Sequence, residues 1–143
     1  MMFNSRSLLT SAIISVLFTP VLSQTVGCFG NVPETVADCS SFIGTFCASL
    51  GVDVMAPQDT ASRCFNLPNG LRCDFFAFNS GGTTDSPSVG NCATGLSLVN
   101  QGCAQNGGQV NFAGLPFVFF LDPNTGPCVV IPTGNIKLNQ SAI

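Results

Sequence analysis

The sequence predicts an α+β fold, a small disulfide-rich α/β sandwich with two helices packed on one face of an antiparallel sheet. Two segments repeat apolar residues at helical spacing, and aromatic, strand-like segments lie between and after them. Eight cysteines are spread over the same part of the chain. A helix, a hairpin, a second helix and further strands, in this order, are typical of helices gathered on one face of a sheet.

The first 23 residues have the order of a secretory signal peptide. Arg6 precedes an apolar run from Leu8 to Phe18, and Val21 and Ser23 are placed before a cleavage site. The run is too short to span a membrane. We therefore expect a protein that is secreted to the extracellular space.

After cleavage, residues 24–131 would form a single domain and residues 132–143 a C-terminal tail. The tail contains a glycosylation sequon at Asn139. No apolar stretch beyond the signal peptide has the length of a membrane span, because Gly, Pro, Asn or Asp interrupts each one. We therefore expect no membrane partner.

An even number of cysteines behind a signal peptide indicates four disulfide bonds. A zinc site is excluded, because the sequence has no Cys-x-x-Cys and no histidine. Eight cysteines allow 105 pairings, so the sequence alone leaves their connectivity open. The disulfide cysteines are Cys28, Cys39, Cys47, Cys64, Cys73, Cys92, Cys103 and Cys128.

Apolar periodicity predicts two helices, over residues 33–51 and 89–103. Pro33 suits the first turn of the first helix, and Glu34 and Asp38 would lie near the positive end of its dipole. A glycine at the end of this segment would stop the helix. The buried faces would comprise Val36, Cys39, Ile43, Phe46, Cys47 and Leu50 in the first helix and Val89, Cys92, Leu96, Val99 and Cys103 in the second.

A β-hairpin is predicted over residues 64–78, where Pro68-Asn69-Gly70 separates two apolar runs. A polar loop follows over residues 79–88. The stretch Asp-Pro-Asn-Thr-Gly has the composition of a tight turn. The remaining elements are strands over residues 110–112 and 116–121, a turn over residues 122–126 and a last short strand over residues 128–131.

The sequence lacks the residues that most catalytic sites need. It has no His, Trp or Tyr, which excludes serine and cysteine triads, metal–histidine sites and ribonucleases with paired histidines. Glu34 is the only glutamate, and Asp74 and Asp122 are the remaining candidates for the carboxylate pair of a glycosidase. No nucleophile–base pair is visible, so we predict a protein that is not an enzyme and needs no cofactor.

Charge is sparse and acidic beyond the signal peptide. Three cations, Arg63, Arg72 and Lys137, stand against seven carboxylates. A nucleic-acid surface or an anionic membrane surface needs clustered Lys and Arg, so neither partner is expected. The oligomeric state is left open.

Residues 122–126 would place a carboxylate, an amide and a hydroxyl together next to a disulfide. Alternation along the preceding strand puts Phe120 on the face opposite the core, where its ring could support a sugar. If the protein binds a glycan or glycoprotein, we expect the polar edge around Asn106, Asp122 and Asn124 to contribute. The alternative is that Asp122 only caps its own turn by bonding to the backbone near Asn124.

Two motifs resemble those of a known family. Cys103-x3-Gly107-Gly108 follows the second helix, and Asp122-Pro123-Asn124-Thr125-Gly126-Pro127-Cys128 closes the domain. With the cysteine spacing from Cys28 to Cys128, this pattern resembles the fungal glycan-binding family typified by the mushroom lectin "Y three". The resemblance implies a small, secreted, lectin-like, cysteine-rich α/β sandwich that binds carbohydrate.

The resemblance also implies a disulfide between Cys39 and Cys73, because this pair looks like an addition to a six-cysteine core. Members of the family usually carry Trp or Tyr on the strand before Asp-Pro-Asn, and this chain has Phe there. The function that the sequence favours is glycan binding. A secreted effector or defence protein that binds a host or microbial protein is the alternative.

Overall fold

The computed structural model describes residues 23–30 and 35–129. Apart from Ser23, the predicted signal peptide lies outside the described residues. The predicted tail with its sequon at Asn139 lies outside them too, as does the end of the last predicted strand.

Five strands form one sheet in the order β1-β4-β5-β3-β2, and all neighbouring strands are antiparallel. The predicted hairpin is confirmed as β2–β3, with Asn69 in the left-handed region at its turn (φ 65°). β3 and β5 pair over their full length at the centre of the sheet. The strands are β1 (Gln24–Cys28), β2 (Thr60–Asn66), β3 (Leu71–Asn79), β4 (Gly108–Phe112) and β5 (Phe117–Thr125).

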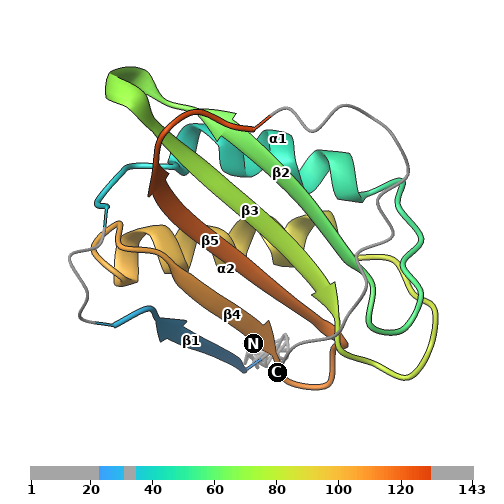
Figure 1. Ribbon diagram of the computed structural model, residues 1–143. Coiled ribbons are helices and arrows are strands. Elements are labelled where there is room, and N and C mark those ends of the chain that lie inside the picture. The colour runs from blue at the N-terminus through green and yellow to red at the C-terminus, as the bar shows by residue number, and fades with distance from the viewer. Residues whose placement is uncertain (1–22, 31–34, 130–143) are drawn as a thin grey trace, which may run out of the picture.

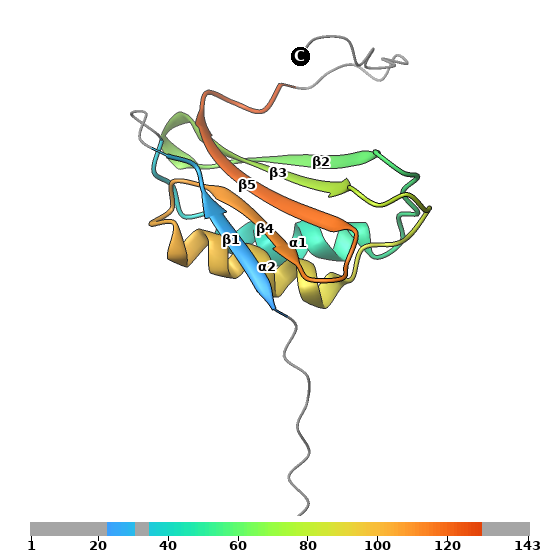
Figure 2. The same cartoon turned by 90° about the horizontal axis from the view of Figure 1, so that it is seen from below.

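Two helices, α1 (Ser40–Leu50) and α2 (Val89–Gly102), cover one face of this sheet. Figure 1 shows them behind the strands, and Figure 2 shows both below the sheet. The predicted α+β fold class, with two helices packed on one face of an antiparallel sheet, is confirmed. Within the described residues, no helix is long and apolar enough to cross a membrane.

The core lies between the helices and the inward-facing residues of the central strands. Phe75 stacks on Phe46 of α1, with ring centroids 5.2 Å apart, and meets the edge of Phe65 at 5.6 Å. Strand alternation turns every second residue toward the helices. The inward residues of β3, β4 and β5 include Cys73, Phe75, Ala77, Val110, Phe112, Phe117, Phe119 and Leu121, all of them buried.

Four disulfides hold the layers together, and no cysteine is free. The predicted bond between Cys39 and Cys73 is confirmed; it joins the residue before α1 to β3, and both side chains are fully buried. Another bond joins the two helices, and a third ties the segment after β5 to β2. The other three bonds are Cys28–Cys103, Cys47–Cys92 and Cys64–Cys128.

The first helix begins at Ser40, later than predicted. The Asp38 carboxylate accepts hydrogen bonds from the backbone N–H of Ser40 (2.9 Å) and from the side-chain amide of Asn100 (3.0 Å). The N–H of Cys39 donates to Asn100 Oδ1 at 3.2 Å. These bonds tie the segment before the helix to α2. Val36 lies in this segment and not in α1, and it is 55% exposed, so its predicted place on the buried face of the helix is wrong.

The hydrogen bonds at Asp38 make folding sensitive to acid. They lower the pKa of Asp38, chiefly through the backbone N–H of Ser40 and then through the Ser40 side chain and the Asn100 amide. Because the folded pKa lies below the unfolded value, this stabilisation is present above the unfolded pKa and is lost as the pH falls through the folded pKa.

We predict that the stability advantage of the wild type over the Asp38→Ala variant shrinks as the pH falls from about 5 to about 2. Urea unfolding of both proteins across this range gives the difference in free energy of unfolding at each pH. A difference that stays constant would show that the Asp38 carboxylate contributes no pH-dependent stabilisation.

The Asp-Pro-Asn-Thr stretch is part of a strand. β5 continues to Thr125, and the chain leaves the sheet at Gly126, which has a φ of 82°. Pro123 is tolerated because β4 begins opposite Leu121, so Pro123 has only β3 as a strand neighbour. The prediction of a turn over residues 122–126 is therefore wrong: pairing with β3 overrides the local turn preference.

Other boundaries also differ from the prediction. β1 has no predicted counterpart, because its five residues show no clear strand periodicity and are ordered by pairing with β4. Cys128 and Val129, the described part of the last predicted strand, form no strand. Val89, predicted on the buried face, is 41% exposed at the start of α2. The predicted second helix is otherwise confirmed.

Candidate functional site

One face of the sheet is not covered by either described helix, and we call it the outer face (Figure 2). Side chains of β3 and β5 alternate between the core and this face. Its central residues are partly buried, and no described helix or second sheet covers them. They are Arg72, Asp74, Phe76 and Phe78 from β3 and Val118, Phe120, Asp122 and Asn124 from β5.

Four of these residues, Arg72, Asp74, Asp122 and Asn124, form a polar cluster at one end of the outer face. Asp74 and Asp122 are direct partners in the β3–β5 register. The amide Nδ2 of Asn124 donates to Oδ2 of both carboxylates, each at 3.0 Å. The amide therefore bridges two negative charges that would repel each other across the strands.

Arg72 completes the polar cluster. Its Nε forms an ion pair with Asp74 Oδ2 at 2.8 Å, and its Nη1 donates to the carbonyl of Thr125 at 2.6 Å. Within the described chain, all hydrogen bonds to Asp74 and Asp122 side chains use the Oδ2 atoms. The Oδ1 atom of each carboxylate accepts no hydrogen bond from the described residues.

Phe76 and Phe120, which we call the aromatic pair, lie directly beside the polar cluster. They are partners in the β3–β5 register, one outward position along from Asp74 and Asp122. Both rings are partly exposed. An aromatic ring next to hydrogen-bonding side chains suits a ligand with one apolar face and a polar rim.

A hollow of about 410 Å³ lies over β2 and β3 at the edge of the polar cluster. Its outer wall is the segment after β5, which is tied to β2 by the Cys64–Cys128 disulfide and by a 2.7 Å bond from the N–H of Cys128 to Asn66 Oδ1. These two bonds hold the wall in place. The hollow is lined by Ser62, Arg63, Cys64, Asp74, Phe76, Cys128 and Val129.

The structure brings three of the four predicted site residues together. Phe120, Asp122 and Asn124 all face outward from β5. Asn106 lies in the turn before β4, and Gly107 after it packs so closely that a Cβ there would come within 2.6 Å of a β5 carbonyl. Over residues 23–30 and 35–129, no hydrogen bond joins the Asn106 side chain to the polar cluster. The binding role of all four residues stays a prediction.

Asp122 does not cap a turn. Its Oδ2 accepts from the side-chain amide of Asn124, and the backbone at both positions belongs to β5. The alternative of a turn-capping Asp122 is therefore wrong. The carboxylate instead takes part in a network that spans two strands.

Sequence reasoning missed Arg72 and Phe76 and considered Asp74 only as a catalyst. In the predicted hairpin these three residues alternate with Cys73 and Phe75. Strand alternation therefore predicts that the three share the face opposite the core. The sequence contains no comparable signal that β5 is their neighbour. That neighbour decides which side chains complete the site.

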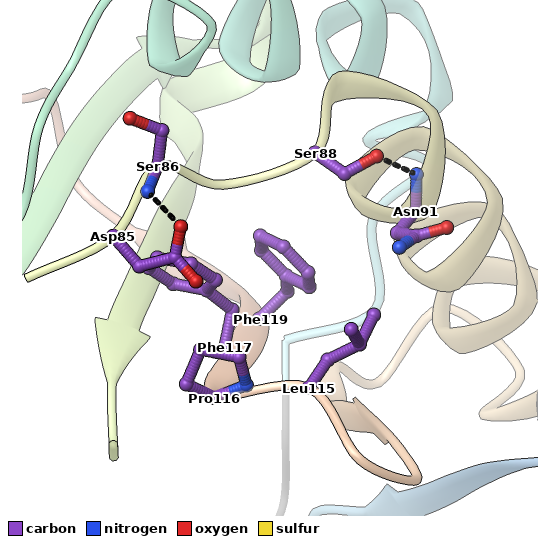
Figure 3. A pocket seen from close by; sticks show the side chains of 8 residues that line it. All are labelled: Asp85, Ser86, Ser88, Asn91, Leu115, Pro116, Phe117 and Phe119. Atoms are coloured by element: carbon purple, nitrogen blue, oxygen red, sulfur yellow. Dashed lines mark hydrogen bonds between the residues drawn. The ribbon is translucent and has the colours of Figure 1, made fainter. Parts of the chain in front are cut away.

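A smaller crevice lies near the other end of β5 (Figure 3). Its volume is about 70 Å³, whereas small-molecule sites usually measure about 300–1,000 Å³. The Asp85 carboxylate and the Ser88 hydroxyl on its rim accept from the backbone N–H groups of Ser86 (2.7 Å) and Asn91 (3.3 Å). These polar groups cap local backbone, so the outer face is the stronger candidate.

Comparison with known proteins identifies a family model and a fungal relative. A family model described as "Glycan binding domain Y3" matches residues 38–128. The Antiviral protein CAP of Coprinus comatus is 41% identical over 96 residues, which cover 65% of this chain and 93% of that protein. The range matched by the family model contains both helices, the polar cluster and the aromatic pair.

Proposed function

The chain belongs to the Y3 glycan-binding domain family, and from that premise we propose that it is a secreted protein that binds glycans with the outer face of its sheet. One observation carries the choice of site. The aromatic pair lies directly beside the polar cluster, and a hollow of about 410 Å³ opens next to both.

The chemistry of the outer face matches that of a sugar. A pyranose has an apolar face, which packs on an aromatic ring, and a rim of hydroxyl groups. The free Oδ1 atoms of Asp74 and Asp122 accept hydrogen bonds from hydroxyl donors. The polar cluster is already held by its internal bonds, which lowers the ordering cost of binding.

The same arrangement argues against catalysis. A glycosidase uses one carboxylic acid as proton donor and the other carboxylate as nucleophile or base. Here one amide donates to both carboxylates, and Arg72 donates to one of them. We therefore propose that Asp74 and Asp122 act as hydrogen-bond acceptors and that the protein is not an enzyme.

Secretion is part of the proposal. The signal-peptide pattern of the first 23 residues supports it. The four disulfides also support it, because disulfides persist in oxidising compartments.

A defence protein or effector that binds another protein is the second candidate. Phe78 and Val118 extend the apolar surface of the aromatic pair along the outer face. An apolar patch on an uncovered face favours a protein partner as well. Binding to a protein in the absence of any glycan would support this candidate.

A glycan array tests the proposed function, with Asp122→Ala as the decisive variant. We expect specific, sugar-competable binding by the wild type and an affinity about tenfold lower or worse for the variant, because a charge-assisted hydrogen bond is lost. Asp53→Ala removes the same charge in the loop after α1 and is the matched control. It should bind like the wild type.

Thermal melting accompanies the array, because a folding defect would also lower binding. A blank array with well-folded wild-type protein would overturn the proposed function. Binding by folded Asp122→Ala at the wild-type level would place the site elsewhere. Release of shorter sugars from the bound glycans would contradict the prediction of no catalysis.

A further inference from the structure

The outer face carries a row of residues that crosses all five strands. The β2–β3 register places Ser62 opposite Phe76, and the β3–β5 register places Phe76 opposite Phe120. The row continues from Phe120 to Gln109 in β4 and from Gln109 to Gly27 in β1. The two rings thus lie between hydrogen-bonding side chains of the flanking strands.

The length of this row corresponds to several sugar residues. Neighbouring strands are about 4.8 Å apart, so Ser62 and Gln109 are separated by about 14 Å across four strands. A linear glycan whose residues are about as long as this spacing, lying across the strands, meets a new side chain with each residue. The row then holds roughly three residues.

The two ends of the row differ. At the β2 end, Ser62 and Phe76 line the hollow together with Cys128 and Val129. At the β1 end, Gly27 has no side chain, and among the described residues a Cβ there would meet only Gln109, at 3.6 Å. A linear ligand on this row can therefore place one residue in the hollow, whereas Gly27 offers no side chain to a ligand at the β1 end.

The polar cluster runs beside this row at the β3 and β5 positions. Asp74 lies two residues before Phe76, and Asp122 lies two residues after Phe120. Each carboxylate is therefore on the same face as the ring next to it. Their free Oδ1 atoms complement the hydroxyl donors of a sugar chain lying on the rings. The two sugar residues that stack on these rings can thus also donate hydroxyl hydrogen bonds to the two carboxylates.

We propose, building on the proposed function, that the outer face binds a linear oligosaccharide over a length of roughly three residues. The oligosaccharide lies across the strands, with one residue in the hollow next to Phe76 and the second residue after it over Gln109. Gln109 is the residue that distinguishes longer from shorter ligands.

An array of linear oligosaccharides of one to six residues, built from hexoses and from N-acetylhexosamines and attached through the reducing end, tests this proposal. We expect affinity to rise with length up to three or four residues and then to level off. Phe76→Ala should weaken ligands of every length. Gln109→Ala should weaken trisaccharides and longer ligands about three- to tenfold and leave disaccharides unchanged, because one hydrogen bond is lost only when the third residue is present.

Gln101→Ala is the matched control, since Gln101 is exposed on α2 in the opposite layer of the molecule. It should bind every length like the wild type. Monosaccharides that bind as tightly as trisaccharides would overturn the proposal and leave the proposed function intact. Equal weakening of all lengths by Gln109→Ala would overturn it too. A blank array would overturn both.

Discussion

Replacing Phe75 by Ala is expected to lower the free energy of unfolding by about 3–5 kcal/mol. Phe75 is fully buried at the centre of the sheet and contacts Phe46 from α1 and Phe65 from β2. Its removal takes away apolar burial and leaves a cavity that two layers share. Urea unfolding followed by circular dichroism measures the loss.

Phe76→Ala is the control, because it removes the same side chain one residue along the same strand. Phe76 faces outward and is partly exposed, so its loss should cost about 1 kcal/mol of stability. Binding should respond in the opposite order: Phe76→Ala lowers glycan affinity, and folded Phe75→Ala retains it. Equal stability losses for both variants would contradict the assignment of the two faces.

Removing the Cys39–Cys73 disulfide with a double alanine variant is expected to cost about 3–4 kcal/mol. The bond closes a loop with a sequence separation of 34 residues, so its loss gives the unfolded chain more conformational freedom. Both cysteines are fully buried where the start of α1 meets β3. Denaturant unfolding of the double variant, compared with the wild type, measures the effect.

Variants of a single cysteine test whether the loss of stability comes from the broken disulfide or from the removed sulfur atoms. Cys39→Ala and Cys73→Ala each break the same disulfide and leave one buried thiol. They should be destabilised about as much as the double variant, provided that peptide mapping shows the other three disulfides intact. A double variant that unfolds like the wild type would show that α1 is held to the sheet by packing alone.

The sequence by itself determined the helices, the hairpin and the number of disulfides. These features depend on local signals: apolar residues at helical spacing from Cys92 to Cys103, and an Asn-Gly turn that needs left-handed backbone at Asn69. Local sterics and one-sided burial act within a few residues of the chain. Such signals are therefore visible without knowledge of the rest of the molecule.

The start of α1 shows where local signals fail. Pro33 and Glu34 have the composition of a helix start, yet α1 begins at Ser40. The reason is a set of bonds from Asp38 and Cys39 to Asn100, which lies on the other helix. A contact between residues so distant in sequence outweighs a weak local preference.

Only the tertiary structure decided the form of the candidate site. Asp-Pro-Asn-Thr has the local chemistry of a turn, but pairing with β3 keeps it extended. The bond between Asn124 and Asp74 spans 50 residues of sequence, and no local pattern specifies it. The β3–β5 register is set by the burial of Phe75 and Leu121 on the inner face, since a slip of one residue would turn these side chains outward. The core therefore determines which polar side chains meet on the outer face.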